Sequence, residues 1–294
     1  MSTNRRKFIQ YGGLGALSFL LPTDQLLAAG GDLFMPGKRL SEFAIQIWSV
    51  KEDMAKDPKG TLKKLGEYGY KQIESFEGKD GIFWGMKNTE FKNYLTEVGT
   101  SIISAHCDIS KDFERKAAEA AEIGMKYLIC PYKGPQKSLD SFKRFVEEFN
   151  NCGDICKKNG IRFAYHNHDY SFKELEGQIP QVLMMEGTNP DTVDFEMDIY
   201  WVVAAGENPE EWMKKYKNRF RLCHIKDRMK TPLPDNKNSS CILGTGSIPF
   251  SKILKTAGDN GMKHFVIEQE YFEGTTPLES AKANAAYLKK LVLA

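Results

Sequence analysis

The stretch Phe-Ala-Tyr-His-Asn-His-Asp-Tyr, at residues 163–170, decides both the fold and the chemistry that this chain predicts. It passes from apolar to polar residues, as expected of a buried strand that reaches the edge of a sheet. It also holds two of the five histidines in the chain of 294 residues. Because side chains alternate along a strand, His166 and His168 project from the same face and form a pair.

One pattern recurs on both sides of this stretch: an amphipathic helical segment, a glycine, and then a short apolar run. The glycines at 69, 99, 124, 160, 187 and 261 stand where helix C-caps with a positive φ angle are expected. Eight runs are interpreted as strands, at residues 43–49, 72–75, 102–106, 127–131, 161–166, 192–198, 220–224 and 264–268. The segments between them, such as 112–123 and 139–158, have a helical apolar stripe.

Apolar strands that alternate with helices predict parallel pairing through right-handed crossovers. Eight such units in about 250 residues match one closed (β/α)8 TIM barrel. The predicted fold class is therefore α/β, with a single domain over residues 42–294. An open doubly wound sheet is the alternative. It would place a glycine-rich phosphate turn after its first strand, whereas residues 49–52 are Ser-Val-Lys-Glu.

The first thirty residues predict export. Arg5, Arg6 and Lys7 precede an apolar run at 11–21 and small residues at 28–30, which is the order of a secretory signal. The paired arginines resemble a twin-arginine signal. The run is too short to span a bilayer of about 30 Å. We therefore expect cleavage near residue 30, a lead-in at 31–41, no integral membrane segment after cleavage, and a periplasmic protein; an N-terminal anchor helix is the alternative.

Charge and cysteine content limit the binding partners and the kinds of cysteine site that we expect. The first thirty residues hold three basic residues and one acidic residue, so the rest of the chain is formally neutral, against +2 for the whole. This balance argues against nucleic acid as a partner. Three of the six cysteines lie in predicted strands or directly after one, at 107, 130 and 223, where they are interpreted as small core residues rather than a disulfide framework or a thiolate zinc site. Homo-oligomerisation is left open.

Polar residues collect at the C-terminal ends of the predicted strands, where a TIM barrel has its active site. These strand-end residues are Gln46, Trp48, Glu74, His106, His166, His168, Glu196, Asp198, His224, Lys226, Asp227, Glu268 and Glu270. Each residue alone has a structural interpretation. His106 could be a core histidine, Glu74 could be an ion-pair partner, and Trp48 could line the site without taking part in catalysis. The set favours a site, because buried carboxylates are costly unless they are paired or bind a metal.

Three of these residues, Asp198, His224 and Glu268, end strands that are neighbours in a barrel. A fourth ligand would come from the fifth strand. A mixed nitrogen and oxygen set suits Mn²⁺, Co²⁺, Zn²⁺ or Mg²⁺ rather than a soft thiophilic ion. The sequence therefore predicts a divalent-metal site at the mouth of the barrel.

With these motifs, the chain from about residue 43 onward resembles the xylose-isomerase-like sugar phosphate isomerase/epimerase family. The matching segments are residues 46–50, 166–168, 198–201, 224–227 and 267–268. The resemblance implies a (β/α)8 barrel whose divalent metal is held by Glu, Asp, His and Glu. By position, these four ligands fall on His166, Asp198, His224 and Glu268.

The chain departs from the family pattern at two positions. His166 replaces a glutamate, and Trp201 replaces a histidine three residues after the aspartate. The first change lowers the protein charge around the ion from minus three to minus two, which leaves a stronger Lewis acid. It also removes one of the two glutamates that a ketose epimerase of this type uses as paired acid and base. Glu268 alone remains in that role.

We therefore expect a metal-dependent carbohydrate enzyme that removes a proton α to a carbonyl and then eliminates, as a lyase or dehydratase. The catalytic candidates are His168, Glu268 and Lys226, and the substrate-binding candidates are Trp48, Glu74, His106, Trp201 and Glu270. For an exported protein, the expected substrate is an unphosphorylated keto sugar or keto-glycoside. A sugar isomerase or epimerase is the alternative; weaker ones are a metal-dependent phosphodiesterase or endonuclease and a non-catalytic sugar-binding module.

Overall fold

The computed structural model describes residues 34–35, 39–234 and 238–294. The predicted signal peptide at 1–30 and most of the lead-in at 31–41 lie outside these residues, so export remains a prediction from the sequence. In the part of the chain that is described, none of the helices combines the length and the apolar character needed to cross a bilayer.

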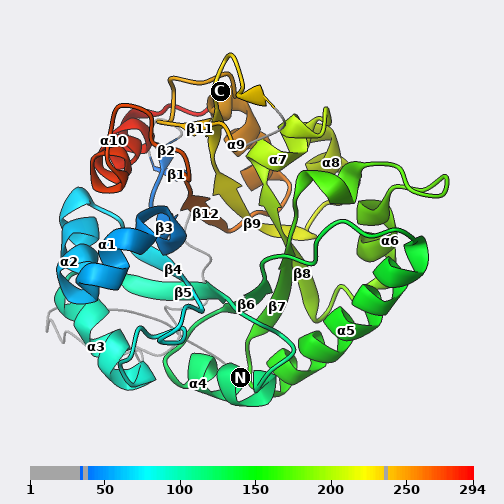
Figure 1. Cartoon of the computed structure of the whole chain (residues 1–294), viewed down its shortest axis with the longest axis horizontal. Coiled ribbons are helices and arrows are strands. Elements are labelled where there is room, and N and C mark those ends of the chain that lie inside the picture. Colours follow the sequence, from blue (N-terminus) through cyan, green and yellow to red (C-terminus); the bar gives the residue numbers. More distant parts are fainter. Residues whose placement is uncertain (1–33, 36–38, 235–237) are drawn as a thin grey trace, which may run out of the picture. The chain divides into compact units, whose positions relative to one another are not determined.

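Eight parallel strands close into a barrel, as the sequence predicted, and helices form a ring around them (Figure 1). The strands are β3 (Ala44–Gln46), β4 (Gln72–Phe76), β5 (Ser101–His106), β6 (Tyr127–Cys130), β7 (Arg162–His166), β8 (Val193–Asp198), β9 (Phe220–Ile225) and β12 (His264–Ile267). They pair in the order β12-β3-β4-β5-β6-β7-β8-β9, and β9 pairs with β12 to close the ring.

At least one helix follows each barrel strand, and two helices follow β3 and β8. The helices are α1 (Lys51–Lys56), α2 (Pro58–Tyr68), α3 (Asn88–Glu97), α4 (Phe113–Glu122), α5 (Leu139–Lys158), α6 (Pro180–Gly187), α7 (Ile199–Ala204), α8 (Pro209–Lys215), α9 (Phe250–Asp259) and α10 (Pro277–Lys290). Two short antiparallel pairs lie outside the barrel, β1 (Phe34–Met35) with β2 (Arg39–Leu40), and β10 (Asp227–Arg228) with β11 (Ser240–Cys241).

The barrel strands are buried on both faces, which explains their nearly continuous apolar sequence. All six residues of β8 and all four of β6 are buried. Residues two apart on a strand share a face, so Leu222 lies below His224 and Ala164 lies below His166. Leu222 and Ala164 belong to one small apolar cluster. This cluster packs inside the barrel below the polar layer at its mouth.

Five of the six predicted helix-cap glycines have a positive φ, including Gly69, the C-cap of α2 at φ 97°. The prediction for Gly187 was wrong, because this residue is the last of α6 and is not among those with a positive φ. A Cβ at Gly187 would lie 2.9 Å from Val146 Cγ1 on α5. The small residue is there to let α5 and α6 pack closely.

A second close approach, at Gly153, gives a test of how tightly α5 packs on the barrel. A Cβ at this position would lie 2.7 Å from Thr192 Oγ1 and 2.9 Å from Val193 Cγ2. We predict that Gly153→Ala lowers the free energy of unfolding by about 1–3 kcal/mol, because the extra methyl overpacks the interface. Urea denaturation measures the change. The matched control is Asn151→Ala on the exposed face of the same helix, which should cause no loss; equal stability of Gly153→Ala and wild type would contradict the packing account.

Candidate active site

The polar layer is built from residues that end adjacent strands. His166 ends β7, Asp198 ends β8, and Glu268 directly follows β12. The register pairs Asp198 with His224 across β8 and β9. Because all the strands are parallel, their C-terminal ends meet at one mouth, and these four side chains converge there.

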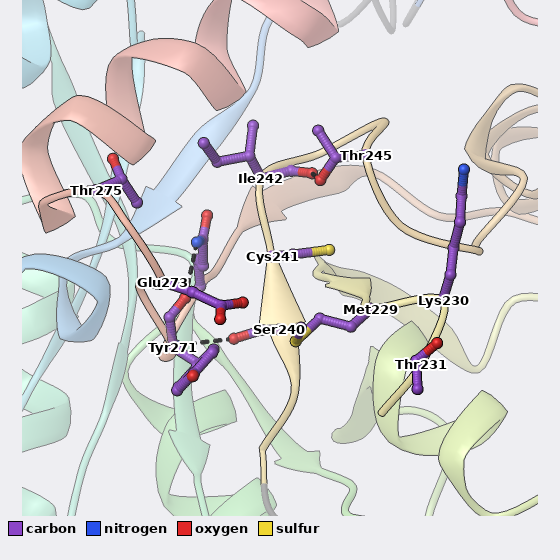
Figure 2. Close-up of a pocket in the computed structure, with 11 residues that line it drawn as sticks. Met229, Lys230, Thr231, Ser240, Cys241, Ile242, Thr245, Tyr271, Glu273 and Thr275 are labelled. Atoms are coloured by element: carbon purple, nitrogen blue, oxygen red, sulfur yellow. Dashed lines mark hydrogen bonds between the residues drawn. The ribbon is translucent and has the colours of Figure 1, made fainter. Parts of the chain in front are cut away.

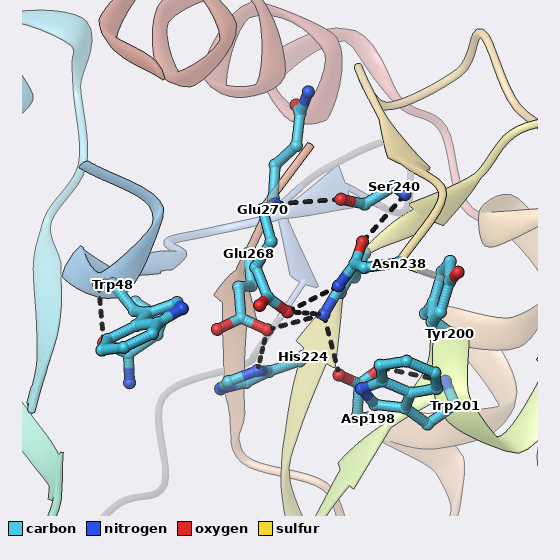
Figure 3. Close-up of polar contacts among 12 residues, drawn as sticks. Trp48, Asp198, Tyr200, Trp201, His224, Asn238, Ser240, Glu268 and Glu270 are labelled. Carbon is cyan, nitrogen blue, oxygen red and sulfur yellow. Dashed lines mark hydrogen bonds and ion pairs between the residues drawn. The ribbon is translucent and has the colours of Figure 1, made fainter. Parts of the chain in front are cut away.

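The structure brings the four predicted metal ligands together. The ligand atoms of Asp198, His224 and Glu268 lie within 4.8 Å of one another, and the three side chains point toward one another from neighbouring strands (Figure 3). The fourth, His166, has its Nε2 3.7 Å from Asp198 Oδ2. His224 Nδ1 lies 3.1 Å from Glu268 Oε2.

This donor set fits a divalent cation. Asp198 is fully buried, and its Oδ1 accepts the backbone N–H of Trp201 at 3.2 Å. Its Oδ2 has no hydrogen-bond partner among the described residues. A buried carboxylate oxygen without a partner carries a large desolvation penalty. A cation beside Asp198, His224 and Glu268 would satisfy it, and would find the mixed oxygen and nitrogen ligands that Mn²⁺, Co²⁺ or Zn²⁺ accept.

A second layer of polar groups lies beneath these ligands. Glu196 precedes Asp198 by two residues on β8 and is completely buried. Its Oε2 is 2.7 Å from His106 Nε2 and 3.0 Å from His166 Nδ1. Glu74 Oε1 is 2.7 Å from His224 Nε2. His106, His166, Glu196 and His224 thus form a second, inner group of potential ligand atoms, which shares His224 with the group of Asp198, His224 and Glu268 and also contains His166.

Burial and neighbouring charge shift the carboxyl pKa values in opposite directions. Burial raises the pKa of Asp198 to about 6, and burial together with Glu74 raises that of Glu196 to about 7. Burial also opposes ionisation of Glu268, but Lys226 and His224 outweigh it and hold the pKa of that carboxyl well below its usual range.

The pKa values of the imidazoles are also shifted in opposite directions. Burial disfavours protonation of His224, yet Glu196 and Glu268 raise its pKa well above the ordinary value. Burial, reinforced by His224, lowers the pKa of His166 far below it. Burial and the charge of Lys226 lower the pKa of His168 to about 3, so this ring is neutral at physiological pH.

Lys226 is the fixed cation of the site. Its side chain is fully buried, and its Nζ lies 3.2 Å from Glu268 Oε2 and 3.7 Å from Asp198 Oδ2. It also contacts Glu270 and lies 5.2 Å from the ring centroids of both Tyr200 and Trp201. Burial opposes its charge, but the carboxylates raise its pKa above the ordinary value. Lys226 therefore stays protonated and supplies positive charge rather than a base.

A cavity of about 330 Å³ opens above this layer. Its lining residues are Trp48, Phe76, Glu77, His106, Cys107, Asp108, Pro131, Tyr132, His166, His168, Glu268 and Glu270. Trp48 follows the first barrel strand and Tyr132 the fourth, so the two stand on different sides of the mouth. They are 38% and 55% exposed, two of the three large exposed hydrophobic side chains in the described part of the chain. Acidic side chains thus lie at the base of the cavity and exposed aromatic rings at its mouth.

The predicted site residues divide between this cavity and the layer below it. Trp48, His106 and Glu270 line the cavity. Glu74 lies beneath it, fully buried, with hydrogen bonds from Gln46 and Ser104. Trp201 is not among the lining residues and lies instead against His168, with ring centroids 5.5 Å apart.

Sequence reasoning assigned no role to several residues that the structure brings to the site. Glu196 was one of the predicted strand-end residues. Because it is two residues from Asp198 on the same strand, its side chain was expected on the same face. Phe76, Glu77 and Asp108 line the cavity from loops and a strand end. No periodicity marks these three residues, so their position depends on how the loops fold over the barrel.

A larger cavity, of about 390 Å³, lies elsewhere, beside β11 and the segment after β12 (Figure 2). It is lined by Met229, Lys230, Thr231, Ser240, Cys241, Ile242, Thr245, Gln269, Tyr271, Glu273 and Thr275. It contains no histidine and one carboxylate, Glu273. Its size alone therefore does not make it the reactive site, and the smaller cavity over the histidines is the better candidate.

A crystal structure of a sugar phosphate isomerase/epimerase from Parabacteroides distasonis is similar with a TM-score of 0.73 and 30% sequence identity, covering 85% of this chain and 98% of that one. The crystal structure of an IolI protein with a bound zinc atom has a TM-score of 0.70 and 16% identity, over 86% of this chain and 99% of that one. The second likeness concerns the fold alone.

Among characterised proteins, the inosose dehydratase of Clostridium perfringens is 27% identical over 165 residues, which is 51% of this chain. The match spans only about half, 55%, of that enzyme's own length. The model of the xylose isomerase-like TIM barrel family matches residues 62–291. The chain belongs to the xylose isomerase-like TIM barrel family.

Proposed function

We propose that this protein is a divalent-metal-dependent carbohydrate enzyme that removes a proton α to a carbonyl and then eliminates water or an alcohol. The observation that carries the proposal is the convergence of Asp198, His224 and Glu268, with His166 Nε2 3.7 Å from Asp198 Oδ2, an oxygen that accepts no hydrogen bond among the described residues. A neutral histidine, His168, lies beside this group in the lining of the same cavity.

His166, Asp198, His224 and Glu268 would hold the metal. The donor set admits Mn²⁺, Co²⁺, Zn²⁺ or Mg²⁺, and the zinc bound by the IolI protein supports an ion of this class. When bound, such an ion supplies a Lewis acid that polarises a carbonyl oxygen of the substrate. Lys226 adds a second, permanent positive charge against Asp198 and Glu268.

The lining of the cavity favours an unphosphorylated sugar. Its four carboxylate residues are Glu77, Asp108, Glu268 and Glu270, and the lining contains neither lysine nor arginine. A phosphate group requires cationic or backbone N–H partners and would be repelled by this set. Exposed aromatic rings at the mouth offer flat apolar surfaces to a sugar ring. A keto sugar, keto-glycoside or inosose fits these constraints, and export through the predicted signal would bring the enzyme to such substrates.

His168 is the proposed base. Its ring is neutral and lies in the lining of the cavity. After it takes the α proton, the imidazolium is a strong acid because burial disfavours its charge. His168 can then return that proton to the departing hydroxyl. The C–H and C–O bonds break, a C=C bond forms and water leaves, so the step is balanced without a further reactant.

An isomerase or epimerase on the same scaffold is the second candidate, and the similarity to the Parabacteroides distasonis protein favours it. Two-base epimerisation requires a second acid or base group on the opposite face of the sugar. His166 occupies the position where the family pattern has a glutamate, and it cannot serve as a base while it binds a metal. The similarity to inosose dehydratases supports elimination as the leading reaction.

The reaction class can be tested by proton NMR of metal-loaded protein with a panel of 2-keto and 3-keto sugars in D₂O. We expect an unsaturated product with loss of a hydroxyl or alkoxyl group. Solvent deuterium at the α carbon with every hydroxyl retained would contradict elimination and support an isomerase or epimerase. Protein that binds no divalent ion at all would rule out the proposed enzyme.

His168→Asn should leave metal binding unchanged and slow formation of the unsaturated product by about 10²–10⁴-fold, because it removes the proposed base. The rate of product formation comes from the same NMR experiment, and metal content from inductively coupled plasma mass spectrometry. His264→Asn is the matched control: His264 begins β12, away from the mouth, and its loss should not change the rate. Product formation at the wild-type rate in His168→Asn would assign the base to another residue.

Metal affinity should rise with pH. Below the pKa of about 6, Asp198 is protonated and is not a ligand, and the raised pKa of His224 means that an incoming ion must displace its proton. Affinity for Mn²⁺ should therefore increase between about pH 5 and pH 8, with net proton release. Isothermal titration calorimetry in buffers of different ionisation enthalpy measures both quantities. A pH-independent affinity without proton release would exclude these two residues as ligands.

A further inference from the structure

Each histidine of the proposed metal set has one ring nitrogen toward the ligands and the other toward a buried carboxylate. His166 Nε2 is 3.7 Å from Asp198 Oδ2, while its Nδ1 is 3.0 Å from Glu196 Oε2. His224 Nδ1 is 3.1 Å from Glu268 Oε2, while its Nε2 is 2.7 Å from Glu74 Oε1. The two rings therefore separate an outer ligand layer from an inner carboxylate layer.

We propose that Glu196 is a positioning residue that fixes the tautomer and the orientation of His166 for metal binding. This inference rests on the proposed function, because it concerns the same metal. A neutral imidazole has one N–H and one lone pair. A carboxylate that accepts the N–H at Nδ1 leaves the lone pair on Nε2, which faces Asp198. Such carboxylates behind metal-binding histidines strongly affect metal affinity.

The polar contacts of the Glu196 carboxylate are all to imidazoles, whereas Glu74 also has other hydrogen-bond donors. Its Oε2 lies 2.7 Å from His106 Nε2, 3.0 Å from His166 Nδ1 and 3.3 Å from His224 Nε2. Its Oε1 has no hydrogen-bond partner among the described residues. Glu74, in contrast, also accepts hydrogen bonds from Gln46 Nε2 at 3.0 Å and Ser104 Oγ at 2.6 Å.

The geometry of β8 explains how this one strand can supply both a proposed metal ligand and the residue that positions a neighbouring ligand. Glu196 and Asp198 are two residues apart on β8, so both project into the barrel. The register pairs His166 with Glu196 across β7 and β8. Asp198 is thus a proposed ligand on the outer level, and Glu196 supports the neighbouring ligand from the level below. His106 reaches Glu196 from β5 and holds the carboxylate from the other side.

The competing arrangement is a cation within the inner group, bound directly by His106, His166, Glu196 and His224. It would use His166 Nδ1 and His224 Nε2, and would therefore disrupt the bond between His224 and Glu74. It would also leave Asp198 Oδ2 buried without a hydrogen bond, with the Lys226 ammonium 3.7 Å away. These two penalties favour the outer position, and the two arrangements make different predictions for His106.

The test is Co²⁺ binding to the full chain, measured by chelator competition and by the visible absorption of bound Co²⁺. Glu196→Gln should weaken Co²⁺ binding about 10–100-fold, the effect expected for a supporting carboxylate. The amide can donate to Nδ1 and so favour the tautomer that carries its N–H at Nε2. The Co²⁺ bands should keep their wild-type positions, because the ligands are unchanged. Unaltered affinity would overturn the proposal.

Three further variants complete the test. His106→Gln should change affinity only a few-fold; loss of Co²⁺ binding with shifted bands would place the ion in the inner group and overturn the proposal. Glu196→Gln in a His166→Ala background should have no further effect, whereas an undiminished loss would show that Glu196 does not act through His166. Glu210→Gln, a glutamate bonded to Thr256 and Lys252, is the control and should bind as wild type.

If Glu196→Gln does not fold, Glu196→Asp replaces it in the same measurement. Aspartate keeps the charge but is one methylene shorter, so its carboxylate recedes from His166. Wild-type affinity in that variant would contradict the proposal. Wild-type protein that binds no Co²⁺ would instead refute the proposed function, so the two failures are distinguishable.

Discussion

The mouth of the barrel concentrates negative charge where water is excluded. Glu74, Glu196 and Asp198 are fully buried and Glu268 is nearly so, whereas Lys226 is the fixed cation among them. Burying ionised carboxylates is costly unless opposite charge and hydrogen bonds compensate. The histidines provide part of that compensation, since the carboxylates raise the pKa values of His106 and His224. A divalent cation would provide the rest.

This constraint links the fold to the chemistry. Apolar side chains such as Ala164 and Leu222 pack inside the barrel below the mouth, and the carboxylates and imidazoles of the candidate site lie above them, toward the C-terminal ends of the strands. There the carboxylates divide into an outer level, with Asp198 and Glu268, and an inner level, with Glu74 and Glu196. His166 lies between the two levels, with Nε2 3.7 Å from Asp198 Oδ2 and Nδ1 3.0 Å from Glu196 Oε2.

Much of the architecture could be predicted from local patterns. Each predicted strand corresponds to a barrel strand, and the predicted helix at 139–158 has the same bounds as α5, Leu139–Lys158. Gly187 shows the limit: its position after a helical stripe suggested a cap, but the residue serves the contact with Val146 on a distant helix. A packing role of this kind is set by tertiary structure and leaves no local signal.

The candidate site was likewise predictable only in part. Strand ends identified the outer residues, because parallel strands must bring their ends together. The role of Glu196 could not be seen in the sequence, since it depends on distances to His106 and His166 across the barrel. Glu74, expected to contact substrate, lies beneath the cavity because Gln46 and Ser104 hold its carboxylate inside the barrel.

Anomalous X-ray diffraction from crystals of the protein loaded with Mn²⁺ tests most directly whether the metal lies in the outer level. We expect one strong anomalous peak per chain, bonded to His166 Nε2, Asp198, His224 Nδ1 and Glu268, with Glu196 and Glu74 hydrogen-bonded to the opposite nitrogens. A peak bonded to His106 and Glu196, or no peak at saturating Mn²⁺, would contradict it.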